Sequence, residues 1–136
     1  MTPRWIAALL AAPAIALVAR VALTSAFWTS GVIKLLDYPG AVAEVAGLGV
    51  PLPAVTAGLV IAVQLLGSAA VILGRFVWLG AGALGVFTLA ATLLAHGFWR
   101  APTAEAARQT ATFLEHIGLI GGLLLAAILA ERRTPR

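Results

Sequence analysis

Four long apolar runs, almost free of charged residues, are the feature that most restricts the fold of this chain. They cover residues 5–33, 53–73, 76–95 and 113–130. A bilayer core about 30 Å thick is crossed by roughly 20 helical residues, so each run is long enough to span a membrane. Of the 136 residues, 62% are hydrophobic and 10% are charged, whereas about a quarter of a soluble domain is charged. We therefore predict an all-α integral membrane four-helix bundle that forms a single transmembrane domain over residues 1–136.

The first apolar run is too long for one straight span, and Pro13 and Arg20 interrupt it. Proline is favoured in the first turn of a helix, so we place the first span at 13–33. Residues 5–12 then form a short interfacial N-terminal extension, and one tilted helix kinked at the proline is the alternative. The start of the chain also resembles a signal peptide, but the run continues to Ile33, which favours a retained anchor.

The connections between the runs predict the topology. Only Gly74 and Arg75 separate the second and third runs, which therefore form a tight antiparallel hairpin. Residues 34–52 predict a short surface helix and a turn, and a helix that starts at Thr103 leads into the fourth run. Basic residues concentrate on the cytoplasmic side of membrane proteins, so the five-to-three distribution of basic residues favours cytoplasmic N and C termini. The inner set is Arg4, Arg75, Arg132, Arg133 and Arg136, and the outer set is Lys34, Arg100 and Arg108.

Several functions are excluded by what the sequence lacks. It has no cysteine, so this chain supplies no disulfide, thiolate nucleophile or zinc–thiolate site. The net charge of +4 comes from residues at segment ends and not from a basic face with interleaved aromatics, so we expect no nucleic-acid partner. No metal-ligand spacing, nucleophile elbow or phosphate-binding loop is present, and we predict no metal site. The lipid bilayer is the one partner that composition requires.

Polar side chains within the apolar runs are the candidate functional residues, because such residues usually face the bundle interior. In the first run they form a stripe, repeated every three or four residues, of Arg20, Thr24, Phe27, Gly31 and Lys34. The stripe either faces the interior or lets its two cations, about 21 Å apart, reach the two headgroup layers. Gln64 lies near the middle of the second run.

A second group gathers where the third span ends and the fourth begins. His96, Trp99, Glu115 and His116 are expected at similar depth on the outer side, near Lys34. Glu115 shares a helix face with Gly118 and Gly122, so we expect it to face inward and to pair with His96, Lys34 or His116. The group fits a proton relay, a quinone headgroup pocket or a structural ion-pair network. Haem is not expected, although the two histidines are its only plausible axial ligands.

The sequence also resembles the DoxX family along nearly its whole length. Arg20 followed by Phe27-x-x-Ser30-Gly31-x-x-Lys34-Leu35 is similar to the family's first-helix pattern. Further matches, in order, are Gly47-Leu48-Gly49-Val50-Pro51, Gln64-x-x-Gly67, Leu73-Gly74-Arg75, His96-Gly97-Phe98-Trp99, Gln109-x-x-x-Phe113-Leu114 and Gly121-Gly122. The chain departs from the pattern at Gln64, where the family often carries glutamate, and an amide cannot exchange protons as a carboxyl group does.

The resemblance implies a bacterial inner-membrane protein associated with redox work, since one namesake is a quinone-reducing thiosulfate oxidoreductase subunit. The leading hypothesis is a subunit that holds a quinone headgroup near the outer side of the bundle. His96 and Glu115 would be catalytic, with His96 moving a proton, and the headgroup would contact Trp99, His116, Lys34, Gln64 and Arg20. The alternatives are a non-catalytic membrane anchor for a soluble or membrane oxidoreductase, and a small transporter that forms a homo-oligomer. Whether this chain is itself an enzyme stays open.

Overall fold

The computed structural model describes residues 2–132, whose secondary-structure elements are all helices, with no strand among them. The elements are α1 (Arg4–Ala11), α2 (Pro13–Leu23), α3 (Ser25–Leu36), α4 (Tyr38–Gly47), α5 (Pro53–Leu73), α6 (Val77–Ala95), the 3-10 turn η1 (Phe98–Arg100) and α7 (Thr103–Arg132). Helices α5, α6 and α7 are each long and apolar enough to cross a membrane. A fourth crossing among the described residues requires α1 and α2 to act as one broken span. The predicted all-helical membrane fold is confirmed.

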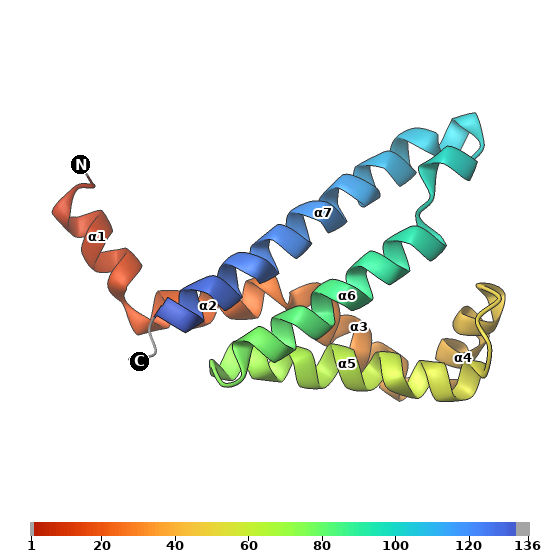
Figure 1. Ribbon diagram of the computed structural model, residues 1–136, viewed down its shortest axis with the longest axis horizontal. Coiled ribbons are helices and arrows are strands. Elements are labelled where there is room, and N and C mark those ends of the chain that lie inside the picture. Colours follow the sequence, from red (N-terminus) through yellow and green to blue (C-terminus); the bar gives the residue numbers. More distant parts are fainter. Residues whose placement is uncertain (1, 133–136) are drawn as a thin grey trace.

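The first apolar run differs from the prediction, because it contains two breaks. Helices α1 and α2 meet at an angle of 64°, and Pro13 opens α2 after Ala12 takes an extended conformation. The single helix expected over 13–33 ends a first time at Thr24, whose hydroxyl donates to the carbonyl of Arg20 at 2.8 Å. Such side-chain bonds compete with the helical ladder and bend it. Helix α3 then starts at Ser25 in a new direction (Figure 1).

The connection after α3 contains the short helix that the sequence predicted. The side chain of Asp37 accepts from the backbone N–H of Gly40 at 3.0 Å and so caps the start of α4. Tyr38 donates its hydroxyl to the carbonyl of Ala54 at 2.6 Å, which ties α4 to the start of α5. Gly49 turns the chain with a φ of 71°. Helix α4 is thereby held against α5.

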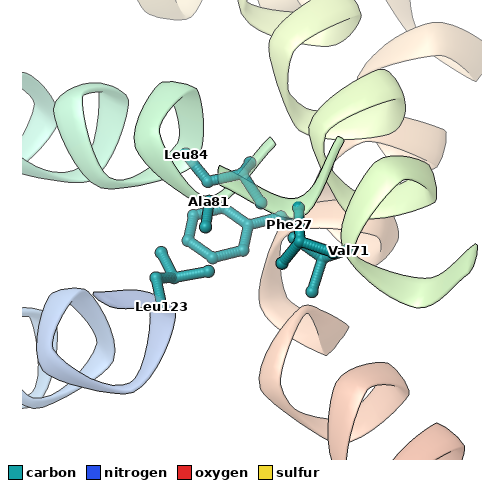
Figure 2. Close-up of a cluster of buried hydrophobic side chains, with 6 residues drawn as sticks. Phe27, Val71, Ala81, Leu84 and Leu123 are labelled. Carbon is teal, nitrogen blue, oxygen red and sulfur yellow. The ribbon is translucent and has the colours of Figure 1, made fainter. Parts of the chain in front are cut away.

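The core lies where α3, α5, α6 and the C-terminal half of α7 meet (Figure 2). Its buried side chains are Phe27, Val71, Val77, Ala81, Leu84 and Leu123. Helices α5 and α6 approach closely because both carry glycine at the crossing. A Cβ built on Gly80 would lie 2.7 Å from the carbonyl oxygen of Gly67. From this core the chain diverges into two arms (Figure 1), one of α3, α4 and α5 and one of α6, η1 and α7.

Candidate functional site

Two histidines are in contact near the connection between α6 and α7. His96 follows the last residue of α6, and His116 lies on the facing side of α7. Their rings touch edge to face, with centroids 5.2 Å apart and planes at 74°. This direct contact leaves no room for a macrocycle between the rings, so the pair does not fit the two axial ligands of one haem.

The hydrogen bonds of the two rings fix which nitrogen carries the proton. The Nδ1 of His96 lies 3.0 Å from Oε1 of Gln109, an atom that can only accept, so this nitrogen donates. Thr92 already donates its hydroxyl proton to the carbonyl of Thr88 at 2.6 Å. Toward the Nδ1 of His116, 2.7 Å away, the Thr92 oxygen must therefore accept. When an imidazole with this Nδ1–H tautomer is neutral, its Nε2 is an acceptor, and no side chain described in the structure occupies Nε2 of either ring.

Three aromatic rings pack beside the histidines. Phe98 and Trp99 of η1 contact Phe113 of α7, with centroid distances of 5.4 and 6.1 Å. Trp99 remains 54% exposed, as is common for tryptophan at a membrane interface. The sequence pointed to Trp99, but it did not predict that Phe98 and Phe113 would complete a cluster.

An apolar groove runs along α6 and α7 below this cluster. It has a volume of about 440 Å³ and extends from Trp78 and Ala127 to Leu89 and Ile117. Ile117 lies one helical turn from Phe113, so the outer end of the groove is one turn from the aromatic cluster. Gly82 and Gly85 line it, and a Cβ on either would meet nothing within 4 Å.

Glu115 does not take the place expected for it. Its side chain is exposed, and it forms no hydrogen bond or ion pair with the residues of 2–132 whose side chains are described. Adjacent residues of an α-helix project about 100° apart, so Glu115 points away from the face that His116 presents to α6. The expected inward position is wrong for Gly118 as well, which is exposed, whereas Gly122 does pack against Leu23.

Lys34 and Gln64 lie on the other arm of the molecule. Lys34 forms an ion pair with Glu44 of α4, so the expected proximity of Lys34 to the histidines is wrong. Gln64 is only 4% exposed and donates from Nε2 to Oγ of Ser30 at 3.2 Å. Among the described residues, its Oε1 is buried without a hydrogen-bond partner, as is the hydroxyl of Ser68 one turn further along α5. These residues join α3 to α5 and do not reach the histidine pair.

Arg20 lies at the opposite end of the bundle from the histidines. Its guanidinium group packs on Gly74, the residue that caps α5, with Cζ 3.3 Å from the position that a Cβ would take. The stripe predicted on the first run is confirmed as an inward face, because Thr24, Phe27 and Gly31 are all buried. Its two cations lie at opposite ends of that face.

Sequence reasoning missed Gln109 as a member of the site. Gln109 precedes His116 by seven residues, which is close to two helical turns, so the two share a face of α7. That spacing was visible in the sequence. What could not be read from it was that His96 would turn toward this face, because His96 lies after the end of α6.

Comparison with known proteins agrees with this architecture. The DoxX family model matches residues 15–97. Inner membrane protein YphA of Escherichia coli (strain K12) is 26% identical over 118 residues, covering 87% of this chain and 84% of YphA. No solved structure matches. With its long apolar helices and a family match over more than half its length, this inner-membrane chain belongs to the DoxX family.

Proposed function

We propose that this DoxX-family chain is a membrane subunit of a redox system and holds the headgroup of a membrane quinone where α6 meets α7. The observation that carries the proposal is the pair of bare Nε2 acceptors on His96 and His116. A quinol presents two hydroxyl donors, and acceptors fixed by neighbouring bonds are well suited to bind them. The quinone would supply the two-electron chemistry, and the chain would bind it and accept protons at Nε2.

The surroundings of the histidines support an aromatic ligand with an apolar tail. Trp99 and Phe98 offer partly exposed ring faces, on which a planar headgroup can stack. The groove of about 440 Å³ between α6 and α7 is lined by apolar residues, and its outer end is at Leu89 and Ile117, one helical turn from Phe113. An isoprenoid chain fits such a groove, since ligand pockets are largely apolar with a few placed polar groups.

The proposal separates residues that sequence analysis had grouped together. His96, His116 and Trp99 lie in the proposed site, and Gln109 and Thr92 position the two rings. Lys34, Gln64 and Arg20 lie elsewhere in the fold and are not part of it. Glu115 is adjacent in sequence but directed to another face of α7, so we assign it no contact with the headgroup.

The test is a binding measurement on the purified chain in mild detergent, with a one-isoprene ubiquinone and a one-isoprene menaquinone as probes. Because neutral imidazoles accept, wild type should bind the quinol form more tightly than the quinone form. His96→Leu and His116→Leu should each weaken quinol binding about tenfold, the value of one charge-free hydrogen bond to a buried group. Thr110→Val is the matched control, since the Thr110 hydroxyl only bonds back to Ala106.

Two results would count against the proposal. If neither histidine variant alters binding while both remain folded, the acceptors do not hold the headgroup. If wild type binds neither probe but copurifies in fixed ratio with one oxidoreductase, the chain acts as the non-catalytic anchor instead.

A further inference from the structure

Basic side chains at one end of this molecule form ion pairs, whereas those described at the other end do not. At the α4 and η1 ends, Lys34 pairs with Glu44 and Arg108 with Glu105. At the other end, where α1, the α5–α6 turn and the C-terminal part of α7 lie (Figure 1), four arginines are described. They are Arg4, Arg20, Arg75 and Arg132, and none forms an ion pair with another described residue. Glu131 is the described acidic residue at this end. It forms no ion pair with another described residue, and it lines a small hollow together with Gly74 and Trp78.

Arg20 is the unusual member of this set, because it is not a free surface side chain. It is partly buried, and its guanidinium group is held against Gly74. Gly74 adopts a φ of 70°, which favours glycine, and the absence of a Cβ there makes room for the guanidinium. A guanidinium held in place with no hydrogen-bond partner among the described residues is prepared to bind an anion.

The residues around the turn indicate which anion fits. Arg75 follows Gly74 directly and is exposed, so a second cationic residue belongs to the turn on which the Arg20 guanidinium packs. Phe76 and Trp78 are 68% and 65% exposed, as expected of side chains at the boundary between headgroups and acyl chains. An apolar groove of about 550 Å³ starts at Trp78 and follows α6 to Phe87. Basic groups above an apolar groove match a phosphate that carries acyl chains.

We propose that Arg20, which packs on Gly74, and Arg75, which follows Gly74 in the chain, form a binding site for the phosphate of an anionic phospholipid. The planar guanidinium of Arg20 makes paired hydrogen bonds to two phosphate oxygens, and Arg75 adds a second donor from the rim. An acyl chain lies along α6 below Trp78. The two arginines lie at the opposite end of the molecule from the histidine pair, and the phosphate site rests on them and not on quinone binding. The groove for the acyl chain shares Trp78, Gly82 and Val86 with the groove assigned to the quinone tail.

Native mass spectrometry of the detergent-purified chain tests the site. Wild type, titrated with phosphatidylglycerol or phosphatidylcholine, should bind its first phosphatidylglycerol at least about tenfold more tightly. Arg20→Gln and Arg75→Gln should each reduce that preference to about threefold or less. Arg4→Gln removes the same charge at the same end but away from the turn, and should retain the preference.

The controls separate a site from a general basic surface. Equal losses in all three glutamine variants would overturn the proposal, because the preference would then follow net charge. Displacement of phosphatidylglycerol by millimolar inorganic phosphate would also overturn it, since the ligand would be free phosphate. Folding is checked by the melting temperature in phosphatidylcholine micelles. If Arg20→Gln fails to fold, exposed Arg75→Gln decides: retained preference there rejects the site.

Discussion

Half of the ten threonines in this chain direct their hydroxyl group back to the preceding helical turn. Five threonines, among them Thr24, Thr88 and Thr92, donate to the carbonyl four residues earlier. This local bond removes much of the cost of placing a hydroxyl in an apolar helix. In Thr92 the same bond has a second consequence, because it leaves the oxygen only able to accept from His116.

Replacing Thr92 by valine should therefore change the chemistry of His116 more than the fold. Valine is close in shape but offers no acceptor to Nδ1, so the Nδ1–H tautomer of His116 loses its support. We expect the other tautomer to become populated and quinol binding to weaken about threefold. The ring ¹⁵N shifts of selectively labelled histidine report the tautomer directly. Unchanged shifts would mean that Thr92 does not position the ring.

Glu115 gives a prediction of the opposite kind. Because it is exposed and forms no ion pair with the described side chains, neutralising it breaks no hydrogen bond or ion pair among them. Glu115→Gln should keep the melting temperature in detergent within about 3 °C of wild type, as surface substitutions usually do. A large fall would show that the carboxylate has a partner, as the sequence had suggested. The sequence predicts how far along α7 Glu115 lies, but it does not predict which side of α7 another helix covers.

At the scale of helices, the breaks in the first apolar run show what sequence can and cannot specify. Pro13 correctly predicted the start of α2, because proline is favoured in the first turn of a helix. The break at Thr24 had no comparable signal, since Thr88 and Thr92 make the same side-chain bond inside an unbroken α6. Whether such a bond ends a helix depends on packing around it. Local chemistry therefore predicted the helices better than their directions.

The contact between α5 and α6 depends on glycine at two facing positions, and it can be tested with a matched pair. A methyl group on Gly80 would meet the carbonyl oxygen of Gly67 at 2.7 Å, and backbone cannot move aside cheaply. Gly80→Ala should lower the free energy of unfolding by about 1–3 kcal/mol. Gly82→Ala lies on the same helix where nothing is within 4 Å, and should be neutral or stabilising by up to about 1 kcal/mol. Unfolding in a denaturing detergent measures both, and equal effects would contradict the close crossing.

At the scale of the whole molecule, two arms diverge from one core, and the polar groups divide between them. Composition alone predicted the membrane class, and hydropathy predicted the apolar runs. The expected depth in the membrane also predicted that Lys34 would lie beside the histidines. That prediction is wrong, because Lys34 belongs to the arm of α3, α4 and α5. The two arms separate from a core in which Phe27 of α3, Leu84 of α6 and Leu123 of α7 pack in one cluster. The pairs of polar side chains that form within each arm could not be predicted from the positions of these residues in the sequence.

The orientation of this molecule in the membrane follows from its charges and can be measured because the chain has no cysteine. The unpaired arginines gather at the end that holds the α5–α6 turn, and basic residues favour the cytoplasmic side. Single cysteines at Arg75 and Glu105, both exposed and at opposite ends, give a matched pair. In intact spheroplasts a membrane-impermeant maleimide should label Glu105→Cys, and it should label Arg75→Cys only after lysis. The reverse pattern would place the termini outside, move the histidine pair to the cytoplasmic side, and transfer the proposed phospholipid site to the outer leaflet.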